Sequence, residues 1–309
     1  MGLSYLVVGA GGVGLSLAGF LAKGGADVSL LARGKQYDTL KQNGLLVRLP
    51  DDTFRADPVI VNEDTLERTY DIILVCVKDY ALESVYDVIH KATTPKSRII
   101  PILNVYGTGE RMQERLIDRC VLCGCIYIAA TKGPGDVTLS GNILKVVFGK
   151  PGEAADDALL REAAREMETC GVTPVYSDDI RYDAMHKFIV ISPWAACGAY
   201  YDVSAGAFLE DGEVRSFYIQ LLREIISVAN ALGLEFGHDM AQECLKLVET
   251  VSPDYTASMQ KDLAKRGPSE IDGLVMEPVR LAKRLGLSVP GYEKVAAKFG
   301  LREEDNEKD

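Results

Sequence analysis

One lysine of this sequence lies beside a long apolar stretch, where its positive charge needs a partner. Lys187 opens a stretch of apolar and small residues, 188–200, that is typical of a buried helix. Burying an unpaired ammonium group is costly, so a lysine beside a core either extends its charged end to water or meets an anion. We therefore expect Lys187 to meet an anion. The alternative is an ordinary lysine at the start of a helix, with its ammonium group in solvent.

A phosphate-binding turn is the second feature that could carry chemistry. Six residues fit the pattern G-x-G-x-x-G, namely Gly9, Ala10, Gly11, Gly12, Val13 and Gly14. They follow an apolar strand and open a helix, which is the context that this pattern requires. The first glycine permits a tight turn, the second lets the backbone approach a pyrophosphate, and the third lets helix and strand pack closely. The helix N-terminus adds amide donors. The sequence therefore predicts a dinucleotide site here.

The end of the second predicted strand indicates which dinucleotide binds. An NAD site usually has Asp or Glu at this position, where the carboxylate binds the ribose 2′-hydroxyl. Here the strand ends at Arg33, Lys35 follows, and Asp27 lies at the opposite end. A guanidinium group can pair bidentately with a 2′-phosphate. We therefore expect NADP(H) with Arg33 as a phosphate ligand; the alternative is a solvated arginine in a loop.

These residues need elements that position them. Up to about residue 176, strand patterns alternate with helix patterns, which indicates an α/β Rossmann-type, doubly wound fold with a largely parallel sheet. From residue 178 onward, helical periodicity dominates and strand signals nearly vanish. We therefore expect two domains: an NADP-binding Rossmann domain at 1–176, and an all-helical (all-α) substrate and dimerisation domain at 177–309.

The composition limits the class of protein. A chain of 309 residues with 47% hydrophobic residues is typical of a two-domain globular protein, and a net charge of −11 disfavours binding to nucleic acid or to a membrane surface. The sequence has no basic signal-peptide region and no apolar run of the ~18 residues that span a bilayer. Cys120, Cys123 and Cys125 have no second cluster to complete a metal site. We expect a cytoplasmic protein with reduced thiols and no metal.

With the glycine turn, the Ala32-Arg33-Gly34 strand end and the lysine helix, the chain resembles the ketopantoate reductase (2-dehydropantoate 2-reductase) family. The resemblance covers nearly the whole chain. Further segments match the family's motifs in order: VKDY, ILNVYGTGE, GDVTLSGNILKVVFG, HKF, SMQKDL and GPSEIDGLVMEPVRLAKRLGLSVP. The resemblance implies a helical domain like that of 6-phosphogluconate dehydrogenase. It also implies NADPH-dependent reduction of a 2-keto acid, with ketopantoate as the leading substrate, for pantothenate and coenzyme A synthesis.

The resemblance also implies roles for single residues. Lys187 matches the family's catalytic lysine, and Glu270 matches its carboxylate for the substrate hydroxyl. Asn104 and Ser258 match substrate-binding residues, and Lys78 matches a lysine near the adenine ribose. Asn104 and Glu270 are expected to contact the cofactor as well. Hydride addition to a ketone builds negative charge on its oxygen, which a protonated lysine can stabilise and then protonate.

The sequence departs from the family's pattern at positions that face the substrate. Ile191 and Ala195 replace two asparagines that commonly follow the lysine by one and two helical turns. Val105 stands where the turn after Asn104 commonly has glycine. Losing hydrogen-bond partners reduces discrimination between substrates. A more apolar 2-keto acid is therefore the alternative substrate.

Other interpretations stay open. Glu270 is purely structural if Ser269 and Asp272 form an N-cap pair at a helix start. A protein that binds NADPH without turnover needs neither Lys187 nor Glu270, which argues against that class. A 3-hydroxyacid or 6-phosphogluconate type dehydrogenase shares the two-domain plan, but the SMQKD and EID segments favour the keto-acid reductase. Apolar helix faces in the second half make a homodimer possible.

Overall fold

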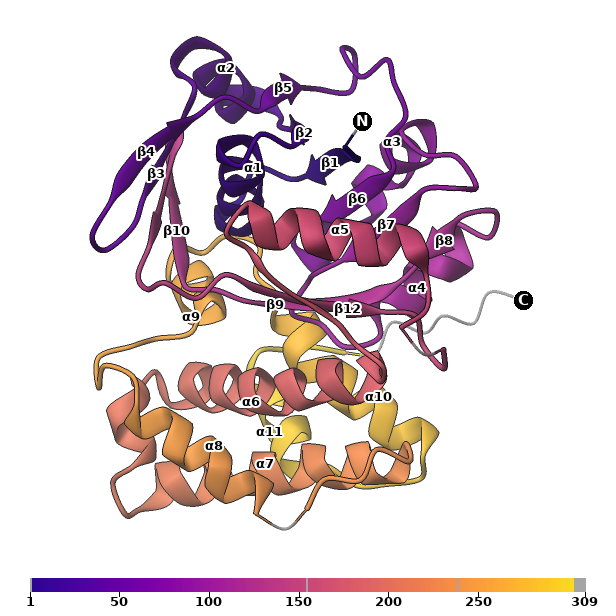
Figure 1. Cartoon of the computed structure of the whole chain (residues 1–309). Helices are drawn as coiled ribbons and strands as arrows, with labels where there is room; N and C mark the ends of the chain where they lie inside the picture. Colours follow the sequence, from indigo (N-terminus) through magenta and orange to yellow (C-terminus); the bar gives the residue numbers. More distant parts are fainter. Residues whose placement is uncertain (1, 154, 238, 303–309) are drawn as a thin grey trace. The chain divides into compact units, whose positions relative to one another are not determined.

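The chain forms two compact units. The structure, a computed structural model, describes residues 2–153, 155–237 and 239–302. The first unit consists of Met1–Leu103 and Gly107–Ala184, and the second consists of Asn104–Tyr106 and Met185–Asp309. The division falls within the long helix α6 (Ile180–Tyr201), a little after the boundary predicted at residues 176 and 177. Figure 1 follows the chain through both units by colour.

The first unit is built on a six-stranded parallel sheet, which confirms the predicted α/β fold. The strand order is β5-β2-β1-β6-β7-β8, and every neighbouring pair is parallel. The strands are β1 (Ser4–Val8), β2 (Asp27–Leu31), β5 (Val59–Val61), β6 (Ile72–Val75), β7 (Arg98–Pro101) and β8 (Cys120–Val121). The order reverses between β1 and β6. In open α/β sheets, ligands bind at such a reversal, outside the carboxyl ends of the strands.

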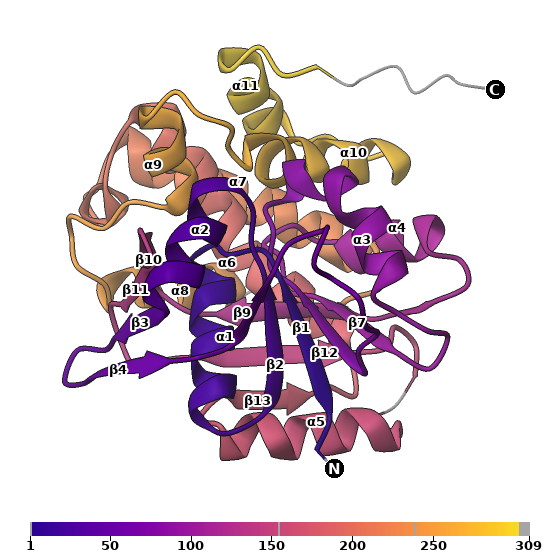
Figure 2. The same ribbon diagram turned by 90° about the horizontal axis from the view of Figure 1, so that it is seen from above.

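Helices cover both faces of this sheet. They are α1 (Gly12–Lys23), α2 (Gly34–Asn43), α3 (Tyr86–Lys91) and α4 (Thr108–Arg115), with the short 3-10 helices η1 (Asp79–Ala81) and η2 (Glu83–Val85). Tyr5 and Val7 of β1 belong to a core with α1 and α2, whereas Leu6 and Val8 belong to a core with α3 and α4. Figure 2 shows α1 and α2 on one side and α3 and α4 on the other. Burial on both faces explains the continuous apolar runs in these strands.

Two smaller sheets, which the sequence did not predict as separate sheets, complete the first unit. One contains β10 (Ala130–Gly133), β11 (Asp136–Leu139), β3 (Leu45–Arg48) and β4 (Thr53–Ala56), in that order. The other contains β13 (Thr173–Tyr176), β12 (Lys145–Gly149) and β9 (Cys123–Tyr127), and α5 (Ala158–Thr169) precedes β13. Only Leu122 separates β8 from β9. Two parallel neighbours in one sheet need a connection of about a dozen residues, which a single residue cannot provide. Strand β9 therefore pairs in a different sheet.

The second unit is helical, as predicted, and no strand occurs in the part of it that the structure describes. After α6 it contains η3 (Ala205–Phe208), α7 (Glu213–Ala231), α8 (Met240–Glu249), α9 (Ser258–Ala264), the π-helix η4 (Asp272–Met276), α10 (Glu277–Arg284) and α11 (Pro290–Lys298). Its core is aromatic: the rings of Phe208 and Tyr218 stack at 4.6 Å, and Tyr292 is fully buried. This core holds α6 against α7 and α11.

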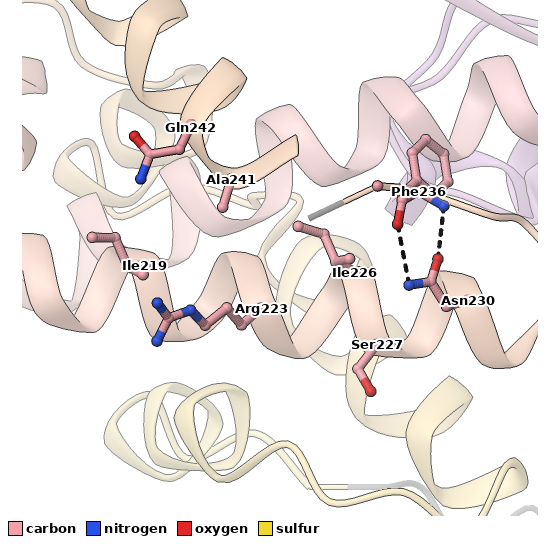
Figure 3. Close-up of a pocket in the computed structure, with 9 residues that line it drawn as sticks. Ile219, Arg223, Ile226, Ser227, Asn230, Phe236, Ala241 and Gln242 are labelled. Carbon is pink, nitrogen blue, oxygen red and sulfur yellow. Dashed lines mark hydrogen bonds between the residues drawn. The ribbon is translucent and has the colours of Figure 1, made fainter. Parts of the chain in front are cut away.

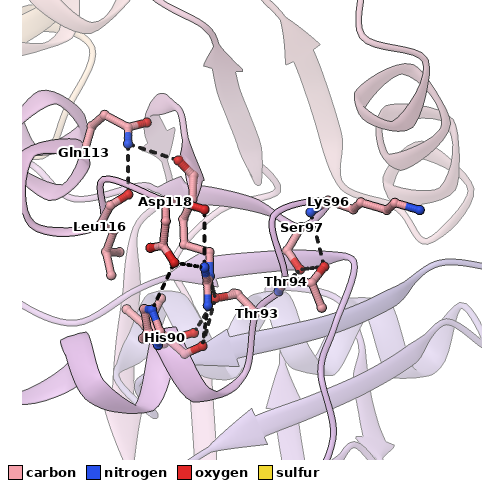
Figure 4. Close-up of polar contacts among 10 residues, drawn as sticks. His90, Thr93, Thr94, Lys96, Ser97, Gln113, Leu116 and Asp118 are labelled. Carbon is pink, nitrogen blue, oxygen red and sulfur yellow. Dashed lines mark hydrogen bonds and ion pairs between the residues drawn. The ribbon is translucent and has the colours of Figure 1, made fainter.

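A polar network ties α3 to the turn between α4 and β8 (Figure 4). His90 Nε2 lies 3.4 Å from Asp118 Oδ2, and Arg119 forms an ion pair with the same carboxylate. Arg119 Nε donates to Thr93 Oγ1 at 2.9 Å, and Gln113 Nε2 donates to the Leu116 carbonyl at 3.0 Å. None of the predicted site residues takes part in these contacts, which connect α3 with the turn before β8.

Within the described residues, no cysteine forms a disulfide bond. Cys123 donates to Glu110 Oε2 at 3.1 Å, and burial raises the pKa of this thiol. Among the residues that the structure describes, no group of three His, Cys, Asp or Glu side chains is placed to hold a metal ion. Within the same residues, no helix combines the length and the apolar character needed to cross a membrane.

Candidate active site

The glycine turn lies at the carboxyl end of β1, where the chain enters α1. Gly9 has a φ of +108°, which favours glycine, and Gly11 is the N-cap of α1. A Cβ atom on Gly14 would lie 1.9 Å from the Gly9 carbonyl oxygen, so only glycine fits there. A Cβ atom on Gly11 would meet nothing within 4 Å. The backbone is therefore open at Gly11 and closely packed at Gly14.

This geometry fits a bound pyrophosphate. Open space over Gly11 allows a phosphate to approach the backbone, and the first N–H groups of α1 point out of the helix as donors. The turn also stands beside the point where the strand order reverses, since β1 is the neighbour of β6. All six residues of the predicted turn belong to this arrangement.

Arg33 follows β2 and is the N-cap residue of α2. Its Nη1 donates to Ser84 Oγ at 2.9 Å, its Nη2 donates to the Ser84 carbonyl at 2.6 Å, and the guanidinium group forms an ion pair with Glu63. Asp27, at the opposite end of β2, pairs with Arg68 at 2.6 Å. Arg33 therefore stands at the predicted edge of the sheet, beside a carboxylate that sequence reasoning missed.

The missed carboxylate lies just after a short strand. Glu63 follows β5, whose three residues pair with β2, and the apolar run Val59-Ile60-Val61 was the signal for that strand. Lys78 follows β6 and is the N-cap of η1, where its side chain is partly buried. Carboxyl ends of parallel strands meet at one edge of a sheet, so Arg33, Glu63 and Lys78 share the edge that carries the glycine turn.

In the second unit, the structure brings three predicted residues together. Lys187 Nζ donates to Asn104 Oδ1 at 2.9 Å, and Asn104 Nδ2 donates to Glu270 Oε2 at 3.3 Å. Lys187 is 5% exposed and Glu270 is 2% exposed. A buried ammonium group and a buried carboxylate are thus joined by one amide side chain. The arrangement holds a hydrogen-bond donor and a hydrogen-bond acceptor of opposite charge at fixed positions.

The π-helix η4 helps to position Glu270, which lies just before it. The Leu274 N–H donates to the Glu270 carbonyl at 2.9 Å. Ser192 of α6 donates to the Leu274 carbonyl at 2.7 Å, and its hydroxyl lies 2.8 Å from the Tyr292 hydroxyl. Wide helical turns of this kind often occur at functional sites. Ser192 therefore binds the backbone of η4, and sequence reasoning missed this role.

Val105 packs directly against η4. A Cβ atom on Gly273 would lie 2.3 Å from Val105 Cγ2. The bulkier residue in the turn after Asn104 is thus accommodated by the absence of a side chain at Gly273. This contact also fixes the backbone next to Asn104.

The face of α6 beyond Lys187 is apolar. Ile191 is partly buried and Ala195 is 2% exposed, and both follow Lys187 at helical spacing. Trp194 packs edge-on against Phe208 and Tyr255, and its buried indole N–H has no hydrogen-bond partner among the described residues. The side chains next to Lys187 along this helix therefore add little polar recognition.

Ser258 makes no hydrogen bond to the three linked residues among the described contacts, and its role stays a prediction. It is the first residue of α9 and is exposed. Asp272, one of the proposed N-cap pair, instead pairs with Arg280 at 2.7 Å. The interpretation of Ser269 and Asp272 as a capping pair therefore does not account for Glu270.

The second unit also contains an open cavity of about 490 Å³ between α7, α8 and the turn after α7 (Figure 3). Its lining includes the apolar residues Ile219, Ile226 and Ala241 and the polar residues Arg223 and Gln242. None of the predicted site residues lines it, so this cavity is distinct from the site around Lys187.

A parallel sheet with a glycine turn at its carboxyl edge defines a dinucleotide-binding protein. Two family models match the chain, ketopantoate reductase PanE/ApbA over residues 5–153 and ketopantoate reductase PanE/ApbA C terminal over residues 179–303. The chain therefore belongs to the ketopantoate reductase family. It is an NAD(P)-dependent oxidoreductase.

The similar proteins match over nearly full length. An "uncharacterized oxidoreductase YkpB" of Bacillus subtilis (strain 168) is 27% identical over 97% of this chain and 99% of that protein. A 2-dehydropantoate 2-reductase of Aquifex aeolicus (strain VF5) is 25% identical over the whole of both chains. The solved structure of a D-mandelate dehydrogenase with NADH and anilino(oxo)acetate has a TM-score of 0.85 at 21% identity, covering 95% of this chain and 96% of that one. This last likeness concerns the fold.

Proposed function

We propose that the protein reduces a 2-keto acid with NADPH, and that ketopantoate, reduced to pantoate, is its substrate. The observation that supports this proposal best is the buried link Lys187–Asn104–Glu270. A protein that only binds a dinucleotide has no need for a buried ammonium group and carboxylate in its second unit, because burying charges is costly.

The chain's own residues have defined parts in this reaction. NADPH supplies the hydride when it is bound. The Lys187 ammonium group stabilises the negative charge that builds on the carbonyl oxygen and gives that oxygen a proton. Glu270 accepts a hydrogen bond from a substrate hydroxyl. Asn104 holds both side chains in place, so that neither has to reorganise during the reaction.

The preference for NADPH rests on Arg33. It stands at the end of β2, where a 2′-phosphate needs a cation, and Lys78 occupies the same edge of the sheet. Arg33→Ala is expected to raise the Kd for NADP⁺ at least about tenfold and to change the Kd for NAD⁺ less than about twofold. Titration calorimetry measures both constants. Equal losses for the two dinucleotides would overturn the assignment.

The substrate is tested by the rate of NADPH oxidation with a panel of 2-keto acids. Ketopantoate is expected to give the highest kcat/KM, in keeping with the name of the relative from Aquifex aeolicus. A more apolar 2-keto acid is the second candidate, because Ile191 and Ala195 line the helix beyond Lys187. A panel in which 2-keto acids with apolar side chains exceed ketopantoate would select that candidate. No turnover with any 2-keto acid would overturn both.

The homodimer stays a prediction. Sedimentation velocity of the purified chain is expected to give twice the monomer mass of 33.6 kDa. A monomer at micromolar concentration would contradict it.

A further inference from the structure

The guanidinium group of Arg33 already has hydrogen-bond and ion-pair partners within the chain. Its Nη1 and Nη2 groups already donate to the Ser84 hydroxyl and carbonyl, and Nη2 also pairs with the Glu63 carboxylate. A 2′-phosphate that binds Arg33 must therefore share or replace an existing negative partner. An NAD molecule has only a hydroxyl group at this position, so its binding does not require Arg33 to share or exchange its negative partner.

The fold places Glu63 beside Arg33. Strand β5 pairs with β2 in parallel register, with Leu31 opposite Val61, and the Ala32 N–H donates to the Val61 carbonyl at 2.9 Å. The segments that follow β2 and β5 therefore leave the sheet side by side. One leads to Arg33 and the other leads to Glu63. The ion pair follows from strand register and does not depend on a long flexible loop.

A closed turn then fixes the backbone that carries Glu63. The Asn62 N–H donates to Thr65 Oγ1 at 3.0 Å, and the Thr65 N–H donates to Asn62 Oδ1 at 2.9 Å. Lys91 Nζ contacts the Glu63 carbonyl at 3.4 Å. These bonds fix the backbone on both sides of Glu63, which favours the position from which its carboxylate pairs with Arg33.

The side chains of Arg33 and Glu63 are 46% and 53% exposed. An exposed ion pair is weak, because water and salt screen it. Glu63 therefore cannot block a phosphate from Arg33, but it competes with the phosphate and repels it. An interaction energy of this size is enough to adjust a preference between two cofactors.

We propose that Glu63 is a specificity-determining residue that weakens the preference for NADPH over NADH. It does so by competing with the 2′-phosphate for Arg33. The proposal rests on the phosphate-binding role proposed above for Arg33 and adds a residue that acts against it. It predicts an enzyme whose two dinucleotide affinities differ less than Arg33 alone would produce.

The test is the binding of NADP⁺ and NAD⁺ to Glu63→Gln, measured by titration calorimetry without substrate. The Kd for NADP⁺ is expected to fall about three- to fivefold, and the Kd for NAD⁺ is expected to stay within about twofold. Asp64→Asn is the matched control, because it removes the same charge one residue further on, where no contact with Arg33 exists among the described residues. A smaller effect of Asp64→Asn shows that the direct pair matters. Thermal unfolding verifies that both variants fold, and Glu63→Ala serves as a second variant.

The double variant Arg33→Ala/Glu63→Gln separates this proposal from the one on which it rests. In the absence of Arg33, Glu63→Gln is expected to lose most of its effect on NADP⁺ binding. If Arg33→Ala weakens both dinucleotides equally, the role of Arg33 fails. If Arg33→Ala is selective but Glu63→Gln and Glu63→Ala leave the ratio of the two Kd values unchanged, or weaken NADP⁺ binding, only the role of Glu63 is overturned.

Discussion

Lys187 and Glu270 carry opposite charges in the interior of the second unit, and each alone would be costly to bury. Asn104 suits the position between them, because its amide offers an oxygen to the ammonium group and an N–H to the carboxylate. An aspartate there would add a second carboxylate, and a leucine would offer nothing. A neutral amide can thus bond to both charged groups without adding a charge of its own.

The first prediction concerns Lys187. Lys187→Ala is expected to lower kcat by at least about a hundredfold, because in the proposed reaction the developing oxyanion loses its proton donor. The Kd for NADP⁺ is expected to change less than about twofold, since the glycine turn and Arg33 lie in the other unit. Steady-state kinetics and calorimetry measure the two quantities, and Lys246→Ala, on the exposed side of α8, is the control. Collapse of cofactor binding would mean that Lys187 has a different role.

Two glycines of the turn, Gly11 and Gly14, are expected to respond in opposite ways to substitution by alanine. Gly11→Ala is expected to change the free energy of unfolding by less than about 1 kcal/mol, because its Cβ meets open space. The same variant is expected to raise the Kd for the dinucleotide at least about tenfold, since the methyl group occupies the phosphate's approach. Gly14→Ala is expected to destabilise the fold by about 3 kcal/mol, because its Cβ would overlap the Gly9 carbonyl. Urea unfolding and calorimetry distinguish the two, and a stable Gly14→Ala would contradict the packing.

A second element-scale prediction concerns the contact between Val105 and η4. Gly273→Ala is expected to destabilise the protein by about 1–3 kcal/mol, because the new methyl group overlaps Val105. The double variant Val105→Ala/Gly273→Ala is expected to recover at least about 1 kcal/mol relative to the sum of the single variants. Gly267→Ala, whose Cβ meets nothing within 4 Å, is the control. Additive effects in urea unfolding would show that the two residues do not share this space.

At the scale of elements, the sequence predicted what depends on local pattern. The turn at Gly9–Gly14, the parallel sheet and the helical second half all follow from periodicity and glycine spacing. The pairing of strands far apart in the chain does not, so the sheet that joins β3 to β11 was missed. Strand β5 has only three residues, too few to show a period, and Glu63 was missed with it. The roles of Lys187, Asn104 and Glu270 were expected only from family resemblance. The hydrogen bonds through Asn104 were not predicted, because no local pattern reports a contact across 83 residues.

At the scale of the whole molecule, buried thiols predict how stability depends on pH. Burial raises the pKa of Cys197 to about 12 and that of Cys244 to about 12, from an ordinary value of 9.0. Between pH 9 and pH 12, the folded state therefore keeps these two protons, whereas the unfolded chain releases them. The resulting stabilisation is complete below pH 9 and is lost as the pH rises from 9 to 12.

The free energy of unfolding is expected to fall between pH 8 and pH 10 by about 1.4 kcal/mol for each of these two thiols. Urea unfolding at the two pH values measures the change. The variant Cys197→Ala/Cys244→Ala is expected to lose that part of the pH dependence, whatever its stability at pH 8. An unchanged slope in this variant would assign the effect to other groups, such as Tyr218, whose pKa burial also raises.

The three residues Asn104–Tyr106 lie in the chain between β7 and α4 of the first unit, yet they are part of the second. No single cut in the gene can therefore release two complete halves. A fragment that starts at Met185 would contain Lys187 and Glu270 but would lack the amide that joins them. Expressing the two halves as separate polypeptides, or exchanging one half with that of a relative, breaks this link unless the short segment is grafted along with the helices.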